Sequence, residues 1–173
     1  MKKKIVILGA GESGYGTALL AKKKGFKVFV SDRGPISQST KNTLDHLNVE
    51  WEENTHTLSK MQDAHLIMKS PGIPALTPVI QSLKSFEIPV VSEIEFASQY
   101  TEATLIGITG SNGKTTTALM TYHILNDAGF DVALAGNIGN SFAKEVAENE
   151  YEFYVLEISS FQLEDIFNFA PHI

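Results

Sequence analysis

A glycine-rich segment with one lysine and several hydroxyl side chains occupies residues 107–117. It follows the apolar run 103–108, which predicts a buried strand, and precedes residues 118–125, which predict a helix. A turn of this kind exposes backbone N–H groups at the positive end of a helix, where phosphate groups bind. The segment therefore predicts a site for a nucleoside triphosphate, although a glycine turn that only joins strand to helix is the alternative.

Three side chains in and near this segment have the chemistry of phosphoryl transfer. Lys114 supplies a positive charge for the terminal phosphates, and Thr115 supplies a hydroxyl for Mg²⁺. Glu157 lies near the carboxyl end of the predicted strand 153–158, where a carboxylate can bind the same ion directly or through water. A helix cap or a surface charge is the alternative for Glu157. We predict Lys114 and Glu157 as catalytic residues and Thr115 and Glu157 as Mg²⁺ ligands.

The loop departs from the general phosphate-loop spacing, because Ile108 stands where that pattern has its first glycine. The remaining residues still offer backbone N–H groups and hydroxyls to ATP. The predicted ATP contacts are Gly110, Ser111, Asn112, Gly113, Lys114, Thr115, Thr116 and Thr117.

A second glycine motif begins the chain. The apolar strand 4–8 is followed by Gly9, Gly11 and Gly14, then by a helix to residue 24 and a strand 27–30. Asp32 follows that strand, 21 residues after Gly11, as in dinucleotide-binding units. The motif predicts a phosphate-bearing ligand, with packing as the alternative role of the glycines. Taken alone it fits an NAD enzyme, but the second nucleotide loop argues against hydride chemistry.

The alternation of strands and helices continues along the chain and predicts an α/β fold. We expect a Rossmann-like doubly wound parallel sheet in residues 1–93, followed in residues 94–173 by the first part of a P-loop ATPase α/β domain. Ser70, Pro71 and Gly72 follow the predicted strand 65–68, so they face a ligand or form a simple proline turn. Residues 92–95 resemble a capping box. Phe161 is expected in the core, with contact to a substrate as the alternative.

Composition excludes several classes of protein. Net charge is −6, with 20 acidic and 14 basic side chains, so nucleic acid is not an expected partner. No cysteine is present, which excludes disulfides and thiolate metal sites and fits a cytoplasmic location. No segment is apolar over a length that could insert into a membrane. The five histidines are scattered, and none is assigned to a metal.

Four segments together resemble the Mur ligase family. They are residues 107–116, Ser70-Pro-Gly-Ile, Gly136-Asn-Ile-Gly and the run from Glu157 to Glu164. The family uses ATP to join an amino acid to a carboxylate through an acyl phosphate. The resemblance implies ATP and Mg²⁺ as cofactors, and UDP-N-acetylmuramoyl-L-alanine and D-glutamate as substrates, in cytoplasmic synthesis of peptidoglycan precursors. The UDP-sugar contacts that it implies are Gly11, Glu12, Ser13, Asp32, Arg33, Ser70, Pro71, Gly72, Asn137 and Ser159.

Members of the family are more than twice as long as this chain. The resemblance therefore implies an N-terminal part that lacks the amino-acid-binding domain and is inactive alone. We expect the strand 153–158 or its neighbour to form an exposed sheet edge, with self-association or local disorder after about residue 103 as the result. A nucleotide-binding module without chemistry and an NAD-dependent oxidoreductase are the alternative functions.

Overall fold

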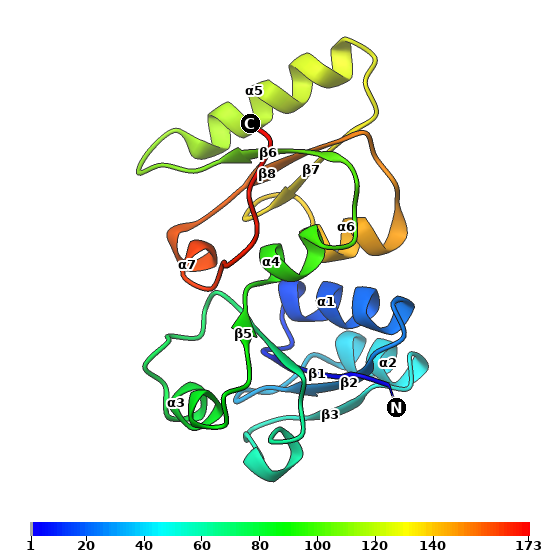
Figure 1. Cartoon of the computed structure of the whole chain (residues 1–173). Helices are drawn as coiled ribbons and strands as arrows, with labels where there is room; N and C mark the ends of the chain where they lie inside the picture. The colour runs from blue at the N-terminus through cyan, green and yellow to red at the C-terminus, as the bar shows by residue number, and fades with distance from the viewer. Residues whose placement is uncertain (1) are drawn as a thin grey trace.

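The computed structural model describes residues 2–173, which form two parallel sheets with helices between and outside them (Figure 1). The strands are β1 (Lys4–Leu8), β2 (Lys27–Ser31), β3 (Glu50–Glu52), β4 (Leu66–Lys69), β5 (Val90–Val91), β6 (Thr104–Ile108), β7 (Val132–Gly136) and β8 (Phe153–Glu157). The helices are α1 (Glu12–Lys23), α2 (Gln38–His46), the 3₁₀ turn η1 (Leu58–Lys60), α3 (Pro78–Ser85), α4 (Glu93–Ser98), α5 (Lys114–Asp127), α6 (Phe142–Glu148) and α7 (Ser160–Leu163).

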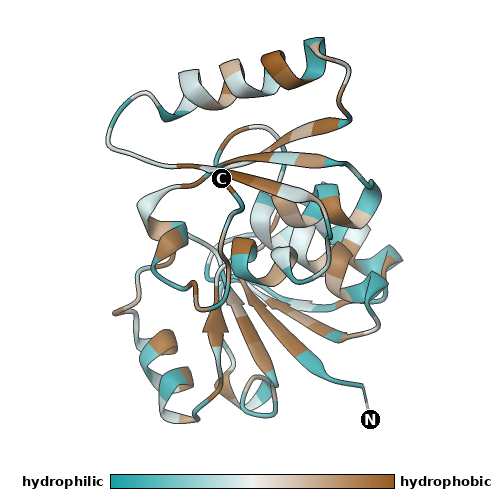
Figure 2. Ribbon diagram, turned by 45° about the horizontal axis from the view of Figure 1, so that its top comes forward, coloured by the Kyte–Doolittle hydropathy of each residue, from teal (hydrophilic) through white to brown (hydrophobic). Residues whose placement is uncertain are grey.

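The first sheet has the strand order β3-β2-β1-β4-β5, and all its pairs are parallel. Every residue of β1 is buried, because α1 and α2 cover one face of the sheet and α3 and η1 cover the other. Apolar residues accordingly run along its strands in Figure 2. The predicted α/β class with a doubly wound parallel sheet is confirmed.

The second sheet has the order β6-β8-β7, with α5 on its outer face. Residues 153–158 do not form the edge, because β8 inserts between β6 and β7 and pairs with both, whereas the alternative, that a neighbour of this strand forms the edge, is confirmed. Within the described residues the edges are β6 and β7. The β6 edge is partly paired, since His172 N–H donates to Leu105 O at 2.8 Å and Gly107 N–H donates to Ile173 O at 2.8 Å.

A layer of three helices, α1, α4 and α6, lies between the two sheets (Figure 1). One apolar cluster runs through this layer and includes Ile7 of β1, Phe96 of α4 and Tyr154 of β8. Helices α1 and α6 approach closely because Gly16 has no Cβ, which would overlap Ser141 Oγ. The two sheets thus share a continuous core.

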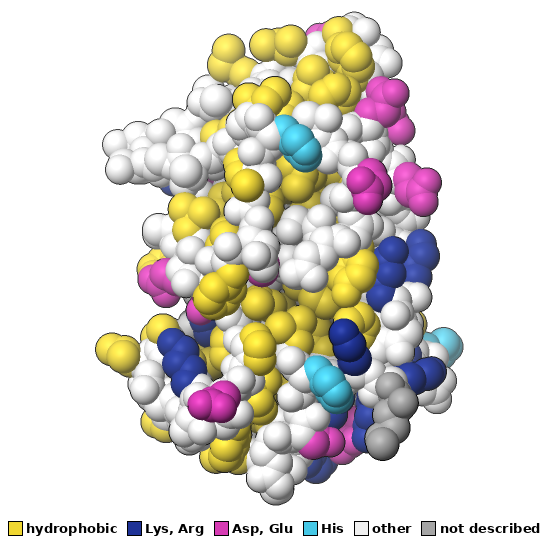
Figure 3. Space-filling model, in the orientation of Figure 1, with side chains coloured by type: hydrophobic (Ala, Val, Ile, Leu, Met, Phe, Trp, Pro, Cys, Tyr) yellow, Lys and Arg dark blue, Asp and Glu magenta, His cyan; other side chains and the backbone are white. Residues whose placement is uncertain are grey.

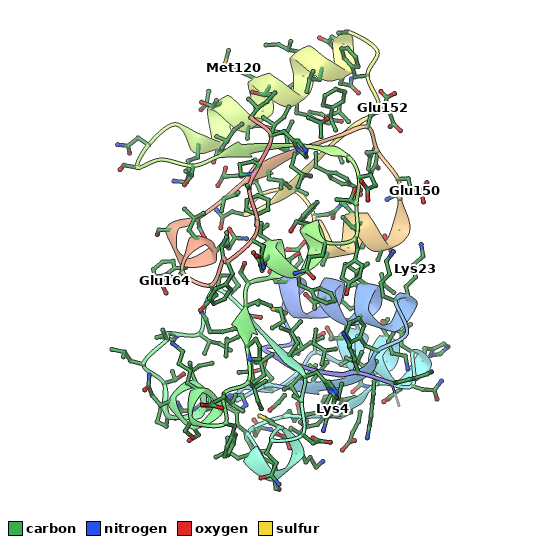
Figure 4. All side chains as sticks on the ribbon, in the orientation of Figure 1. Lys4, Lys23, Met120, Glu150, Glu152 and Glu164 are labelled. Atoms are coloured by element: carbon green, nitrogen blue, oxygen red, sulfur yellow. The ribbon has the colours of Figure 1, made fainter. Side chains whose placement is uncertain are left out.

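Polar contacts reinforce this layer. Lys23, at the end of α1, lies beside α6 and donates from Nζ to Ala147 O at 2.7 Å (Figure 4). The buried Glu93 of α4 accepts from Ser141 Oγ at 2.6 Å and from Ala143 N at 2.9 Å. Lys69, at the end of β4, pairs with Asp165 at 2.9 Å. Each contact joins α1, α4 or the first sheet to a residue further along the chain, in the second half.

Residues 92–95 do not form the capping box that the sequence suggests. Ser92 Oγ accepts from Glu95 N at 3.2 Å, as expected of an N-cap. The Glu95 carboxylate, however, turns away and accepts from the N–H groups of Phe167, Asn168 and Phe169 at 2.8–3.0 Å. The complete capping box is at α7, between Ser159 and Gln162.

Several apolar side chains are exposed on the second half. On α5 only Ala118 is buried, while Met120 and Ile124 are 59% and 66% exposed. Apolar side chains accordingly gather over α5 in Figure 3, and Figure 4 shows Met120 on its outer face. Phe161 is 60% exposed, so its expected place in the core is wrong; the short helix α7 presents it to solvent. None of the helices in residues 2–173 combines the length and apolarity needed to cross a bilayer.

Candidate functional site

The glycine-rich loop of residues 107–117 joins β6 to α5, as predicted. The helix begins earlier than expected, at Lys114, so Lys114 and Thr115 belong to its first turn. Gly113 is its N-cap with φ +75°, and Gly110 has φ +145°, conformations that side chains with a Cβ rarely adopt. The loop therefore brings the chain into α5 with the first N–H groups of the helix free of intrahelical partners. Such a helix start suits a phosphate group.

The carboxyl ends of all three strands of the second sheet meet beside this loop. Glu157, at the end of β8, is only 2% exposed. Its Oε2 accepts from Thr115 Oγ1 at 2.7 Å, and its Oε1 accepts from Asn137 Nδ2 at 2.7 Å. Lys114 Nζ donates to Gly110 O at 2.8 Å. The structure therefore brings Lys114, Thr115, Asn137 and Glu157 together from three elements.

The donor atoms at this point fit Mg²⁺. Thr115 offers a hydroxyl and Glu157 a carboxylate, both hard oxygen ligands. Residues 2–173 contain no group of three or more His, Cys, Asp or Glu side chains that could hold a metal. Proteins usually hold Mg²⁺ through one or two carboxylates together with the phosphates of the substrate, and Glu157 offers one carboxylate here.

Two cavities lie at the carboxyl edge of the first sheet. The larger, about 590 Å³, is lined by Gly9, Asp32 and Arg33 and by the apolar residues Ile73 and Pro74. The smaller, about 400 Å³, lies at the start of α1. It is lined by Ala10, Gly11, Glu12, Tyr15, Asp32, Pro35, Ile36, Ser37 and Thr40. Asp32 lines both cavities, so a ligand with a nucleoside and a diphosphate could occupy the two together.

Asp32 also holds the backbone around it. Its Oδ2 accepts from Ala10 N at 2.7 Å and its Oδ1 from Gly34 N at 2.8 Å. These bonds join the first glycine loop to the turn after β2. The close approach of this loop to β4 requires Gly9, whose added Cβ would overlap Ser70, and Ser70 Oγ is buried there without a hydrogen-bond partner.

The predicted UDP-sugar residues fall into three groups. Those lining a cavity of the first sheet are Gly11, Glu12, Asp32, Arg33 and Gly72. Ser13, Ser70 and Pro71 lie beside these residues in the chain but line neither cavity. Asn137 and Ser159 lie at the second sheet, where Asn137 contacts Glu157 and Ser159 caps α7. The structure therefore does not gather all of these residues around one cavity.

Residues after β3 also line the larger cavity and were not predicted. They include Asn54, Thr55 and His56. Ser31 Oγ, which is buried at the end of β2, lies 2.7 Å from His56 Nδ1 and 2.8 Å from Glu52 Oε1. Burial raises the pKa of Glu52, but hydrogen bonds from Thr57 and Ser31 outweigh it and the pKa is lowered. Burial lowers the pKa of His56, against the opposing charges of Glu52 and Asp32.

The direction of β3 is the signal that could have identified these residues. β3 is parallel to β2, so the residues that follow β3 must reach the same edge of the sheet as Asp32. The three-residue strand is too short for its hydropathy pattern to identify that edge.

The two halves of the chain match two family models. Residues 4–79 match the model described as the MurD N-terminal domain, and residues 108–171 match the Mur ligase middle domain. The chain belongs to the Mur ligase family.

Two relatives extend the likeness over the whole chain. It is 57% identical over 173 residues to UDP-N-acetylmuramoylalanine--D-glutamate ligase of Christiangramia forsetii, covering 100% of this chain and 39% of that protein. It is 53% identical to the ligase of the same name from Bacteroides thetaiotaomicron, covering 99% of this chain and 38% of that protein. The Mur ligase chain thus spans less than half the length of these relatives.

Solved structures of two ligases share the fold of this chain. One is UDP-N-acetylmuramate:L-alanyl-gamma-D-glutamyl-meso-diaminopimelate ligase from Neisseria meningitides, with a TM-score of 0.59, 23% identity, and coverage of 91% of this chain and 52% of that one. Another is a pseudomurein peptide ligase type C from Methanothermus fervidus, with a TM-score of 0.56, 26% identity, and coverage of 91% and 33%.

Proposed function

We propose that the whole protein is an ATP-dependent ligase that adds D-glutamate to UDP-N-acetylmuramoyl-L-alanine through an acyl phosphate, in the cytoplasmic synthesis of peptidoglycan precursors. Relatives that are 57% and 53% identical carry the name of this ligase, which supports the choice of substrates. Residues 1–93 form the UDP-sugar-binding domain in this proposal, and residues 94–173 form the start of the ATP-binding domain.

One observation carries the proposal. Lys114, Thr115 and Glu157 converge at the N-terminus of α5, with Glu157 bonded to both Thr115 and Asn137. Packing alone does not require a buried carboxylate, a hydroxyl and a cation at a glycine-rich helix start. Phosphoryl transfer does, because negative charge develops on the transferring oxygens.

Each side chain has a distinct role in the proposed reaction. The N–H groups of the loop and the first turn of α5 bind the phosphates of ATP, and Lys114 offsets the charge on the terminal phosphate. Mg²⁺, held by Thr115 and Glu157, would neutralise charge on the phosphate oxygens when bound. Asn137 orients the Glu157 carboxylate from β7. The first sheet positions the carboxylate of the UDP-sugar for attack on the γ-phosphate.

Calorimetric titration of the chain tests the proposal. We expect UDP to bind at the first sheet, ATP with Mg²⁺ to bind at the second, and NAD to bind at neither. We expect no D-glutamate addition by the chain alone, because positioning of both reactants supplies about 7–11 kcal/mol of such barriers. Tight NAD binding without UDP binding would contradict the assignment. D-Glutamate addition by the purified chain would contradict the expected inactivity.

A further inference from the structure

The buried hydroxyl of Ser31 is shared by three neighbours. Glu52 Oε1 lies at 2.8 Å, Thr55 O at 3.2 Å and His56 Nδ1 at 2.7 Å. The hydroxyl has one proton to donate and two lone pairs that accept. Neither the ionised carboxylate nor the backbone carbonyl can donate. The hydroxyl proton must therefore point to one of these two oxygens, or a short oxygen–oxygen contact is left without a proton.

This count of protons places a proton on His56 Nδ1. If Ser31 donates to Glu52 or Thr55, then His56 Nδ1 must donate to Ser31 Oγ. A neutral imidazole with its proton on Nδ1 carries a lone pair on Nε2. Within residues 2–173, His56 Nε2 has no hydrogen-bond partner, and the ring lines the larger cavity.

The neutral form also agrees with the charges around the ring. Burial lowers the pKa of His56, and the positive charge of Arg33 acts in the same direction, although Glu52 and Asp32 oppose it. A neutral ring with an acceptor nitrogen has nothing to offer a phosphate group. It does suit an N–H or O–H donor of a ligand.

We propose that His56 is a specificity residue of the first domain, whose Nε2 accepts a hydrogen bond from the nucleoside half of the bound nucleotide. This inference depends on the proposed binding of UDP by that domain. The start of α1, which suits a diphosphate, lines the smaller cavity, and Asp32 lines both cavities, so a diphosphate at α1 leaves the adjoining larger cavity, with His56, for the nucleoside. The donor is either the N3–H of the base or a hydroxyl of the ribose.

Calorimetric titration of the chain with UDP tests the role of His56. In His56→Asn the side-chain amide can still donate to Ser31 Oγ, but no atom occupies the place of Nε2. We expect UDP to bind about three- to tenfold more weakly to this variant, the usual effect of one lost hydrogen bond. His46→Asn is the matched control, because His46 lies on α2, lines neither cavity and has its ring Nδ1 hydrogen-bonded to Asn42 O on the same helix.

Three analogues identify the donor. We expect one of 3-methyl-UDP, 2′-deoxy-UDP and 3′-deoxy-UDP to bind the wild-type chain more weakly than UDP does. That analogue should bind His56→Asn with the same affinity as UDP, because the variant has already lost the hydrogen bond that the analogue cannot form. If all three analogues lose as much affinity with the variant as with the wild type, His56 accepts no bond from the nucleoside and the inference is wrong. Unchanged UDP affinity in His56→Asn would also overturn it, while the proposed function would stand. A wild-type chain that does not bind UDP overturns both.

Nitrogen NMR of the wild-type chain gives a readout that depends on no variant. We expect the His56 ring to carry its proton on Nδ1 at neutral pH, and the Nε2 signal to move towards that of a hydrogen-bonded nitrogen when UDP is added. A proton on Nε2 in the free chain, or an Nε2 signal that UDP leaves unmoved, would contradict the inference.

Discussion

Lys114 and Thr115 are neighbours at the start of α5. Their hydrogen-bond partners all lie in the second half, so each residue serves the ATP step of the proposed reaction and not the binding of the UDP-sugar. Lys114 Nζ reaches back to Gly110 O, and Thr115 reaches across to Glu157. Neither touches the first sheet. In the whole protein we therefore expect Lys114→Ala to lower kcat roughly 10²–10³-fold while the KM for the UDP-sugar stays near its wild-type value.

Steady-state kinetics checks this prediction. Arg33→Ala provides the comparison, because Arg33 lines the cavity of the first sheet and its loss should raise the KM for the UDP-sugar with less effect on kcat. An unchanged kcat in Lys114→Ala, with weaker UDP-sugar binding, would show that the loop does not serve ATP.

Glu95 is a second residue whose contribution can be measured by itself, and it contributes to the stability of the fold. Burial raises the pKa of its carboxyl group, but the N–H groups of residues 167–169 outweigh this and lower it below the ordinary value of 4.5. A lowered folded-state pKa means that Glu95 stabilises the fold above about pH 4.5, and that this contribution disappears as pH falls through the folded-state pKa. We expect Glu95→Gln to lower the free energy of unfolding by about 1–3 kcal/mol near neutral pH.

Urea denaturation over a range of pH measures this effect. The difference between wild type and Glu95→Gln should shrink as the solution is acidified below about pH 4.5. Glu102→Gln, at an exposed position, should change little at any pH. A difference between Glu95→Gln and wild type that is independent of pH would show that the carboxylate charge is not responsible.

At the scale of the elements, features that depend on neighbouring residues could be predicted from the sequence, and features that depend on distant residues could not. The glycine loops and apolar runs predicted the strands of both halves, because turn residues and burial act within a few positions of one another. The central place of β8 could not be predicted, since it depends on how two crossovers pack. Glu95 was assigned to a cap because its real partners begin 72 residues further along the chain. His56 was missed because β3 is too short to reveal its direction.

The contact between helices α1 and α6 leads to a third prediction. A Cβ at Gly16 would overlap Ser141 Oγ and crowd the backbone of Lys144. We expect Gly16→Ala to lower the free energy of unfolding by about 1–3 kcal/mol, as overpacking does. Gly72→Ala is the control, because a Cβ there meets no atom within 4 Å. Thermal melts of the two variants make the comparison, and equal melting temperatures would contradict the close packing of α1 on α6.

The exposed apolar side chains of α5 support a fourth prediction. Met120 and Ile124 lie on the same helix and are more than half exposed, and burying such surface against a second copy is favourable. We expect the chain to self-associate through α5, and the double change Met120→Glu with Ile124→Glu to reduce it. Leu76→Glu, at an exposed position in the first half, should have no effect. Sedimentation velocity decides, and a wild-type chain that stays monomeric at high concentration would refute the prediction.

At the scale of the whole molecule, the helical layer of α1, α4 and α6 should make the two sheets unfold together. Its apolar cluster contains residues from both sheets, so neither sheet can lose its inner cover without exposing the other. We expect calorimetry to record one melting transition rather than two. Two separate transitions would show that the layer does not join the halves.

The same layer has a consequence for ligands that bind one sheet only. In a cooperative unit, a ligand that binds the folded form stabilises every part that unfolds with it. UDP held at the first sheet should therefore slow hydrogen exchange in β6, β7 and β8, which it does not touch. Bound nucleotide would then stabilise the whole chain, and the fraction of first domains that hold nucleotide would set how long the second domain stays folded.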